Sequence, residues 1–265
     1  MSALGGADPP RDCPICPRLV AYRGENRAEH PDWWNGPAPS FGDPDARLLI
    51  VGLAPGRTGA NRTGRPFTGD FAGVLLYQTL LKAGFARGTY EARPDDGLEL
   101  VDCMIGNAVR CAPPQNKPLT AEEAACRPFL AARIAALPRL KVIVTLGGIA
   151  RRSTLRALGM KASAGVAGHG SETRAGPYDL INSYHCSRLN TNTGRLTPAM
   201  FEATFETARA RLDGLSERPA AAPSPDRASA GPVRASSRVR PRCCACHAPS
   251  CREPAPAPAS PCPGR

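Results

Sequence analysis

Four cysteines that lie far apart in the sequence are the residues best suited to bind an inorganic centre. Cys13 and Cys16 form a C-x-x-C pair in which a proline follows each cysteine, and Cys111 and Cys126 lie much further along the chain. Four thiolates brought together can close a tetrahedral metal site or hold an iron–sulfur cluster. The alternative is that they are ordinary buried or unpaired thiols, which is the usual role of a single cysteine.

Charge and cysteine usage indicate a partner and a compartment. The 265-residue chain carries a formal net charge of +11 and eleven cysteines. Excess positive charge favours a polyanionic partner, either nucleic acid or an anionic membrane surface. No segment is apolar for long enough to cross a bilayer, and residues 1–10 lack the pattern of a secretory signal. We therefore expect a cytoplasmic protein without a membrane span, in which reduced cysteines act as ligands rather than as disulfides.

Apolar runs predict strands that alternate with helices. The strands are expected at residues 47–53, 99–109, 141–146 and 178–183, and the helices at residues 17–26, 70–85, 120–137, 149–158 and 197–212. This alternation is typical of a parallel sheet covered by helices on both faces. Because the loops that leave the carboxyl ends of parallel strands meet at one edge, the loops after Leu53, Val109 and Ser183 form the expected binding site.

Three local patterns refine these elements. Apolar or small residues recur at helical spacing within residues 70–85, namely Phe71, Val74, Leu75, Thr79 and Leu80. Thr120 and Glu123 have the spacing of a capping box, which predicts the start of the following helix. The glycine-rich residues 159–177 suggest a hairpin.

Composition divides the chain into three parts. Residues 1–12 are small and polar and are expected to be flexible, residues 13–215 form one α/β domain, and residues 216–265 are rich in Pro, Ala, Ser and Arg. A segment of that last composition cannot bury a core and is expected to be disordered. Its arginines outnumber its acidic residues, so it can add salt-sensitive, non-specific affinity for DNA. Its five cysteines and His247 allow a zinc site, although their spacing fits no standard arrangement.

Several further motifs occur in the loops at the expected edge. They are residues 52–56 (GLAPG), 61–70 (NRTGRPFTGD), 110–118 (RCAPPQNKP) and 183–197, which begins with Ser-Tyr-His. Together with the cysteine pair, and in the same order along the chain, they resemble the iron–sulfur uracil-DNA glycosylases. One branch of that superfamily carries an acidic residue within the first motif, where this chain has Leu53. The missing acid, with the Thr-Gly-Asp and Asn-Lys-Pro segments, makes the chain similar to the type-5 branch.

The resemblance implies a fold, a cofactor and an activity. The fold is a three-layer α/β/α sandwich with a central four-stranded parallel sheet. The cofactor is a 4Fe-4S cluster on the four cysteines named above, where it holds the N-terminal segment to the loop that carries Asn116 and takes no part in hydrolysis. The activity is the removal of uracil, and often of other deaminated bases such as hypoxanthine, from DNA, by a monomer that acts at the nucleoid. Gly52, Ala54 and Gly56 line the base pocket in this interpretation.

Removal of a base from DNA places specific demands on the site. The base must be flipped into a pocket, because its glycosidic bond is out of reach inside a duplex. Cleavage leaves negative charge on the base, which a hydrogen-bond donor can stabilise; His185 is the candidate donor, and a structural histidine is the alternative. Water then attacks the sugar with help from a carboxylate, for which Asp70 is the candidate. Asp70 is equally well placed to cap a helix, and one carboxylate can do both.

Three other side chains are candidates for contacts with the base. Phe67 can stack on the flipped base, although core packing is the commoner role of a phenylalanine. The resemblance places Asn116 in the active site, and in the acid-bearing branch an asparagine at the position of Asn107 reads the edge of uracil. Either asparagine can instead be a turn or capping residue.

Arg188, Leu189 and Asn190 directly follow the histidine loop and are candidates for contacts with DNA. A side chain such as Leu189 or Arg188, inserted into the base stack, can fill the space that the flipped base has left. No lysine in the matched motifs is an evident Schiff-base former, so we expect a monofunctional enzyme that does not cut the strand. The competing interpretation is a metal-stapled module that binds DNA or nucleotides without catalysis.

Overall fold

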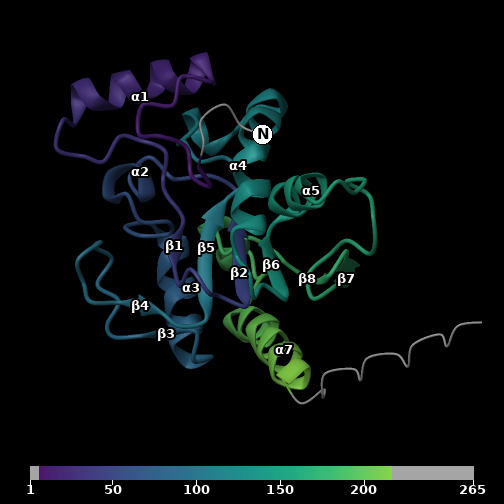
Figure 1. Cartoon of the computed structure of the whole chain (residues 1–265). Coiled ribbons are helices and arrows are strands. Elements are labelled where there is room, and N and C mark those ends of the chain that lie inside the picture. Colours follow the sequence, from purple (N-terminus) through teal and green to yellow (C-terminus); the bar gives the residue numbers. More distant parts are fainter. Residues whose placement is uncertain (1–5, 217–265) are drawn as a thin grey trace, which may run out of the picture. The chain divides into compact units, whose positions relative to one another are not determined.

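The structure is a computed structural model that describes residues 6–216 (Figure 1). The predictions made for residues 1–5 and 217–265, including the basic arm and the zinc site, lie outside the described residues. Within residues 6–216, no helix is both long and apolar enough to cross a membrane.

The described residues form a six-stranded sheet whose centre is parallel. Its order is β1-β5-β2-β6-β8-β7, with β5 (Cys103–Asn107), β2 (Leu48–Gly52), β6 (Val142–Leu146) and β8 (Tyr178–Ser183) at the centre. These four strands pair in parallel, which confirms the predicted four-stranded sheet. The short strands β1 (Phe41–Gly42) and β7 (Glu172–Ala175) add antiparallel edges that were not predicted as part of the sheet. β7 lies in the glycine-rich segment and forms a hairpin with β8.

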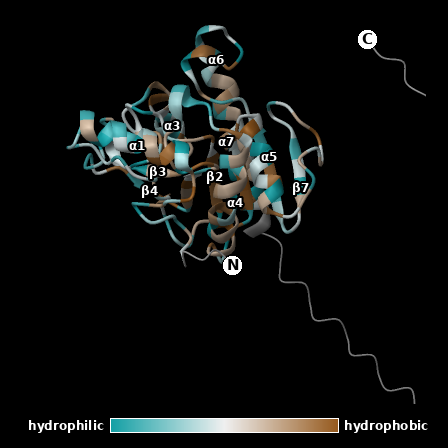
Figure 2. Cartoon of the chain, turned by 90° about the horizontal axis from the view of Figure 1, so that it is seen from above, coloured by the Kyte–Doolittle hydropathy of each residue, from teal (hydrophilic) through white to brown (hydrophobic). Residues whose placement is uncertain are grey.

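Several helices lie outside the layers that cover the sheet. α1 (Pro17–Glu29) extends three residues beyond its predicted end at residue 26. The single turns α2 (Ala60–Thr63), the 3-10 helix Pro114–Asn116 and α6 (Arg188–Asn192) lie in the loops after β2, β5 and β8. Figure 2 shows α6 in a loop that projects beyond α3 and α5. The sequence does not predict these turns, because a single turn is too short to show helical periodicity.

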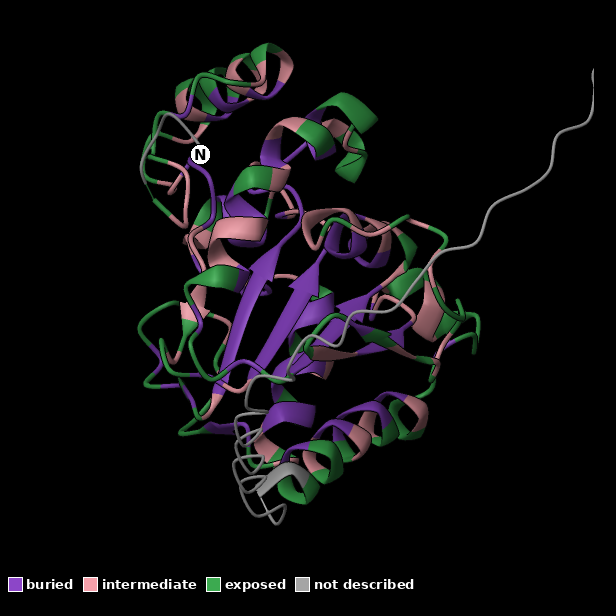
Figure 3. Cartoon of the chain, turned by 45° about the vertical axis from the view of Figure 1, so that its right-hand side comes forward, coloured by how far each residue is buried: buried purple, intermediate pink, exposed green. Residues whose placement is uncertain are grey.

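Helices cover both faces of the sheet and form a three-layer α/β/α sandwich, as predicted. One face is covered by α3 (Phe71–Lys82) and α7 (Pro198–Ser216), and the other by α4 (Thr120–Ala135) and α5 (Gly148–Ala157). Residues 48–51 of β2 are fully buried because they pack against helices on both sides, and Figure 3 shows that the central strands are buried along their length. Apolar runs without alternation are therefore correct signals of strands in this chain.

The predicted strand over residues 99–109 is wrong in its first half. β4 (Glu99–Leu100) pairs with β3 (Ala86–Arg87) in a separate two-stranded sheet, and β5 begins only at Cys103. Asp102 separates the two strands because its backbone is left-handed, with φ 53°. The Asp102 carboxylate accepts hydrogen bonds from the backbone N of Arg47 at 2.9 Å and from its Nε at 2.7 Å, which ties this turn to the start of β2.

The capping box lies one residue earlier than predicted, so the prediction of Thr120 as the N-cap is wrong. Leu119 is the N-cap of α4, and its backbone N donates a hydrogen bond to Glu122 Oε2 at 2.8 Å. Glu122 therefore supplies the reciprocal half of the box, and no hydroxyl side chain takes part in it. Arg18 also pairs with Glu122, so this helix start is tied to α1.

The residues whose spacing predicted α3 do not all face the core. Thr79 and Leu80 are buried, whereas Phe71 and Val74 are 41% and 43% exposed. Other side chains complete the buried face of the helix, namely Leu76 and Tyr77. Helical spacing alone does not say which side of a helix meets the sheet, and here the two apolar residues of the first turn face outwards.

The carboxyl ends of the central strands meet at one edge of the sheet. Gly52 pairs with Asn107, and Leu146 with Ser183. The connection after β2 runs through α3 over one face, whereas those after β5 and β6 run through α4 and α5 over the other face. The chain therefore diverges beside β2, which is where open α/β sheets bind ligands.

Candidate active site

A pocket of about 480 Å³ opens at this carboxyl edge. Its walls come from the loop after β2, the start of α3, the end of β5, the 3-10 helix and the loop after β8. The residues predicted from the sequence that line it are Ala54, Gly56, Phe67, Asp70, Asn107, Asn116, His185 and Arg188. Phe71 and Ser187 also line it, although the sequence gave no reason to place them in the site. Residues from five separate segments thus share one cavity.

Asp70 presents its two carboxylate oxygens to different surroundings. Oδ1 accepts a hydrogen bond from Gly73 N at 3.0 Å and so caps α3. Oδ2 faces two glycines: a Cβ added at Gly59 would lie 2.5 Å from it, and one added at Gly56 would lie 3.4 Å away. These glycines leave room for the second oxygen beside the pocket. Capping and water activation, which the sequence left as alternatives, are therefore compatible in one carboxylate.

His185 follows β8 by two residues, and a side chain of α6 holds its backbone. Asn190 Nδ2 donates a hydrogen bond to the carbonyl oxygen of His185 at 2.8 Å. The centroid of the imidazole lies 6.1 Å from that of the Phe67 ring, with an interplanar angle of 30°. No described residue hydrogen-bonds to the imidazole nitrogens, so one of them is available to a ligand in the pocket.

Burial moves the protonation equilibria of both candidate catalytic side chains towards the neutral forms. Burial raises the pKa of the Asp70 carboxyl, and hydrogen bonds from the backbone N–H groups of Gly73 and Ala72 oppose this rise. Burial also lowers the pKa of the His185 imidazole. An uncharged imidazole at neutral pH can still donate one N–H to a ligand.

Phe67 and Asn107 form the floor of the pocket, and Gly52, which was predicted to line the pocket, instead packs against these two side chains. A Cβ at Gly52 would lie 2.4 Å from Asn107 Oδ1 and 2.6 Å from Phe67 Cζ, so only glycine fits between them. Phe67 is 6% exposed and belongs to the main hydrophobic core, yet it also lines the pocket. The two roles considered for Phe67 from the sequence are thus not exclusive.

Asn107 carries an unpaired polar atom at this floor. Its Oδ1 is buried and has no hydrogen-bond partner among residues 6–216, and the residue is 2% exposed. A buried acceptor without a partner costs about 1–3 kcal/mol. The cost is recovered when a donor enters the pocket, and the N–H edge of a base is such a donor.

Phe71, Asn116, Arg188 and Leu189 form the rim of the pocket. Asn116 is exposed and left-handed, with φ 57°, and it ends the 3-10 helix. The guanidinium carbon of Arg188 lies 5.1 Å from the centroid of the Phe71 ring. Leu189 is 72% exposed and stands outside the pocket itself. Asn190, the third predicted contact to DNA, turns its amide inwards to His185.

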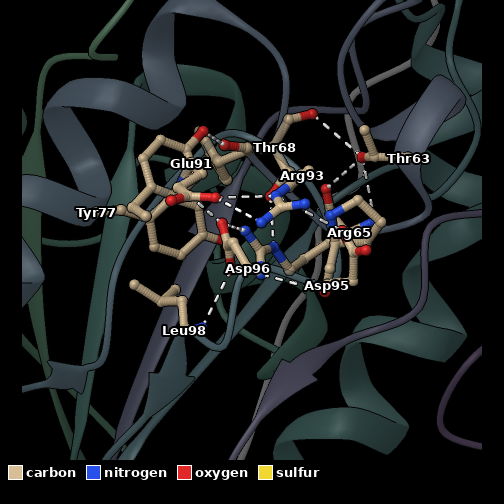
Figure 4. Close-up of polar contacts among 12 residues, drawn as sticks. Thr63, Arg65, Thr68, Tyr77, Glu91, Arg93, Asp95, Asp96 and Leu98 are labelled. Atoms are coloured by element: carbon tan, nitrogen blue, oxygen red, sulfur yellow. Dashed lines mark hydrogen bonds and ion pairs between the residues drawn. The ribbon is translucent and has the colours of Figure 1, made fainter.

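An ion pair that sequence reasoning missed lies behind the floor. The side chains of Arg65 and Asp96 are 5% and 0% exposed, and they are joined by two hydrogen bonds of 2.8 and 2.7 Å (Figure 4). The hydrogen bonds from Arg65 hold the pKa of the Asp96 carboxyl well below its usual range. Backbone N–H groups of Glu91 and Leu98 also donate to this carboxylate, at 2.9 and 3.1 Å.

This ion pair helps to hold the loop that carries Phe67. Tyr77 and Tyr90 pack against the Arg65 guanidinium and donate hydrogen bonds to the carbonyl oxygens of Pro66 and Phe67, at 2.6 and 3.1 Å. The segment 86–98, which lies between two of the predicted elements, therefore supports the pocket. Nothing in the sequence distinguishes Asp96 from its exposed neighbour Asp95, so no local signal could have found it.

The four cysteines predicted as ligands line one cavity between α1, α4 and the loop after β5. Cys13 and Cys126 are buried and Cys16 and Cys111 half-buried, among the apolar side chains of Leu19, Val109 and Phe129. Burial, followed by the charge of Cys126, raises the pKa of the Cys111 thiol to about 12, and burial raises that of Cys126 to about 11. An electropositive centre is needed to keep Cys111 and Cys126 as thiolates in this setting.

The donor set fits an iron–sulfur cluster, whose ligands need not meet at one point. Among residues 6–216, no group of three or more His, Cys, Asp or Glu side chains converges on a point that could hold one ion. A cluster carries its cysteines on different iron atoms, so its ligands surround a cavity instead of meeting at a point. Hydrogen-bond donors also reach the sulfurs: Arg110 N lies 3.3 Å from Cys126 Sγ, and Arg23 Nη1 lies 3.9 Å from Cys111 Sγ. Such contacts accompany cluster thiolates.

The other two described cysteines lie elsewhere. Cys103 is fully buried in the core cluster under α3 and α7, where it packs as a small core residue. Cys186 is in the same cluster, and its thiol donates to the carbonyl oxygen of Ala72 at 3.5 Å. Neither belongs to the cavity of the four predicted ligands.

Comparison with known proteins identifies the family. The model of the uracil DNA glycosylase superfamily matches residues 39–209. A type-5 uracil-DNA glycosylase of Thermus thermophilus is 46% identical over 209 residues, which cover 77% of this chain and 94% of that protein. Type-5 enzymes of Pyrobaculum aerophilum and Mycobacterium bovis are each 41% identical, over 70% and 77% of this chain and 83% and 79% of theirs. The chain therefore belongs to the uracil-DNA glycosylase superfamily.

Proposed function

We propose that this protein is a DNA repair enzyme that excises uracil by hydrolysing its N-glycosidic bond. The observation that carries this proposal is the convergence of Asp70, Asn107 and His185 on one pocket at the carboxyl edge of the sheet. A carboxylate, an unpaired amide oxygen and an uncharged imidazole are the groups that this hydrolysis requires. The relatives at 41–46% identity carry the same activity in their names.

The pocket residues have separate roles in the proposed mechanism. Uracil flipped out of the helix enters between Phe67 and the His185 loop, and the Asn107 oxygen accepts a hydrogen bond from its N–H edge. As the glycosidic bond breaks, negative charge grows on the base, and an N–H of neutral His185 stabilises it. The second oxygen of Asp70, Oδ2, orients the attacking water and balances the positive charge on the sugar. Asn116 assists from the rim.

The pocket also supports a wider choice of bases. Its volume of about 480 Å³ is more than a single-ring base occupies. Leu53 lines it at the place where an acidic side chain would otherwise add charge. We therefore include hypoxanthine and other deaminated bases among its substrates.

We propose that the enzyme is monofunctional. No lysine is among the residues that line the pocket, so no amine is in place to form a Schiff base with the sugar. The product is then an intact strand with an abasic site, which breaks only on treatment with alkali. We further propose that the enzyme is a monomer that acts on the nucleoid in the cytoplasm and contacts DNA through the loop of Arg188, Leu189 and Asn190; the formal net charge of +11 supports a polyanionic partner.

A 4Fe-4S cluster on Cys13, Cys16, Cys111 and Cys126 completes the proposal. When bound, the cluster supplies a covalent anchor between segments that are distant in the sequence. The chain between Cys111 and Cys126 carries Asn116, and Cys13 and Cys16 precede α1. The anchor therefore fixes the position of Asn116 relative to the rest of the rim. Brown anaerobically purified protein with about four iron atoms per chain is the expected result, and stoichiometric zinc would contradict it.

One assay separates this proposal from a binding module without chemistry. Holo-protein is incubated with a labelled oligonucleotide that contains one uracil, and the products are run on a gel before and after alkali. Cleavage only after alkali is expected. Protein that binds this DNA but releases no base, and that is unaffected by Asp70→Asn, would show that the binding module is the correct interpretation.

A further inference from the structure

Phe71 is an exposed aromatic residue at the pocket that the mechanism above does not use. It is the first residue of α3, it lines the mouth of the pocket and it is 41% exposed. Val74, one turn later on the same helix, is 43% exposed. Large apolar side chains grouped on the surface of a folded domain mark interaction sites more often than isolated ones do. The core of the domain does not require Phe71, because other residues of α3 form its buried face.

Phe71 is also connected to the loop expected to enter DNA. The guanidinium carbon of Arg188 lies 5.1 Å from the centroid of the Phe71 ring. Among the described residues, this stacking is the one polar or ring interaction of the Arg188 side chain. Leu189, the next residue, is 72% exposed. Figure 2 shows that α6, which begins with these two residues, projects from the domain. An aromatic ring, an unpaired cation and an exposed leucine therefore lie together at the rim.

We propose, on the basis of the glycosylase function above, that the side chains of Phe71 and Leu189 enter the DNA base stack together and act as one wedge. Leu189 fills the space left by the flipped base, and the Phe71 ring stacks on the base next to it in the same strand. Arg188, ordered by its contact with Phe71, contacts the phosphate between the two nucleotides. Stacking on an aromatic ring tolerates any base, so the wedge supports flipping in every sequence context.

The occupant of this surface is duplex DNA rather than another protein. The surface is continuous with the mouth of the pocket, so any partner seated on it also meets the base that enters. Arg188 lacks a carboxylate partner among the described residues, which suits a phosphate. A wedge speeds uracil release only where a base stack must be opened. Loss of the wedge should therefore slow release from double-stranded DNA more than release from single-stranded DNA.

The test compares rates on two forms of one oligonucleotide. Uracil release is measured for the wild type, Phe71→Ala, Phe71→Tyr and Val101→Ala, with the uracil strand alone and in a duplex. Val101 is the matched control because it is apolar and 38% exposed at the amino end of β5, on the opposite edge of the sheet. In Phe71→Ala, the ratio of duplex to single-strand rates should fall roughly tenfold. Phe71→Tyr should keep the ratio, because its ring still stacks.

A second measurement detects insertion of the wedge into the base stack and does not depend on uracil release. The fluorescence of 2-aminopurine next to the uracil rises when its stacking is disturbed, and we expect Phe71→Ala to change this signal on the duplex. An unchanged rate ratio in Phe71→Ala, or an equal loss in Phe71→Tyr, overturns the wedge and leaves the glycosylase function standing. If the wild type releases no uracil from either form, the proposed function fails. In that case the 2-aminopurine fluorescence by itself tests the proposal of a wedge. A difference between wild type and Phe71→Ala supports the proposal, and equal signals overturn it.

Discussion

The floor and the rim of the pocket are built in opposite ways. Phe67 and Asn107 of the floor are 6% and 2% exposed, whereas Phe71 and Leu189 of the rim are 41% and 72% exposed. The floor rests on the central strands and on the buried ion pair of Arg65. The rim is held by helix caps and one cation–aromatic contact. The floor is therefore shaped before a substrate arrives, whereas the apolar side chains of the rim are exposed to solvent.

Asp70 lies where floor and rim meet, and its replacement should have the largest effect. Asp70→Asn keeps the cap, because Asn caps helices about as well as Asp. It removes the carboxylate that we propose orients the attacking water, so the rate of uracil release should fall roughly a thousandfold. Stability should stay equal or rise, because a buried charge is lost. Single-turnover release and thermal unfolding measure the two effects; Asp32→Asn, at an exposed carboxylate, is the control. A near-normal rate would limit Asp70 to capping.

The pH profile of the wild type provides a second check on Asp70. Burial raises its pKa above the ordinary value of 3.8, so activity should be present at neutral pH and should fall as the pH drops through this raised pKa. The carboxyl itself stabilises the fold at low pH, and that contribution is lost as the pH rises through the same value. Asp70→Asn should lack this acid limb. If the limb persists, another group controls the reaction.

The support behind the floor is tested by Asp96→Asn. Arg65 would stay buried without its partner, so the free energy of unfolding should fall by about 3–5 kcal/mol. Because the folded pKa of Asp96 is lowered, its contribution is present above the unfolded pKa and is lost as the pH falls through the folded pKa. Urea unfolding at neutral and acid pH measures both effects. Glu99→Gln, in an exposed pair with Arg87, is the control and should cost less than about 1 kcal/mol.

Gly52→Ala tests whether the floor tolerates any added atom. Its Cβ would meet Asn107 Oδ1 and Phe67 Cζ, so the protein should lose about 1–3 kcal/mol of stability and also bind the base more weakly. Gly148→Ala is the matched control, because a Cβ there has nothing within 4 Å. Equal behaviour of the two variants in unfolding and uracil release would show that the floor is more adaptable than its geometry indicates.

The smallest effect is expected at the rim. Asn116→Gly removes the side chain but suits the left-handed backbone, so stability should change by no more than about 0.5 kcal/mol. The rate of uracil release should fall roughly tenfold, the loss of one hydrogen bond in the transition state. Gln115→Gly is the control, because Gln115 has the same conformation, with φ 56°, and does not line the pocket. A loss of stability in Asn116→Gly alone would mean that this part of the rim is structural.

The floor was easier to predict from the sequence than the rim. Gly52 and Asn107 end buried apolar strands, so their place at the sheet edge follows from the run of residues before them. Phe71 and Val74 fit the helical pattern but face outwards, because periodicity gives the spacing of a helix and not its orientation. The break between β4 and β5 at Asp102 was not predicted for a similar reason, since no local sequence pattern indicates a left-handed residue inside an apolar segment.

Local patterns in the sequence were sufficient for the four parallel strands, the loops at their carboxyl ends and the motifs that those loops carry. Each of these depends on neighbouring residues, whose burial and chemistry repeat over short distances. The packed structure alone determined that one Asp70 oxygen caps while the other lies beside Gly56 and Gly59, that Asn107 Oδ1 has no hydrogen-bond partner within residues 6–216, and that Asp96 meets Arg65. Burial and pairing of single atoms depend on where distant segments meet, and the spacing of residues within one segment does not contain that information.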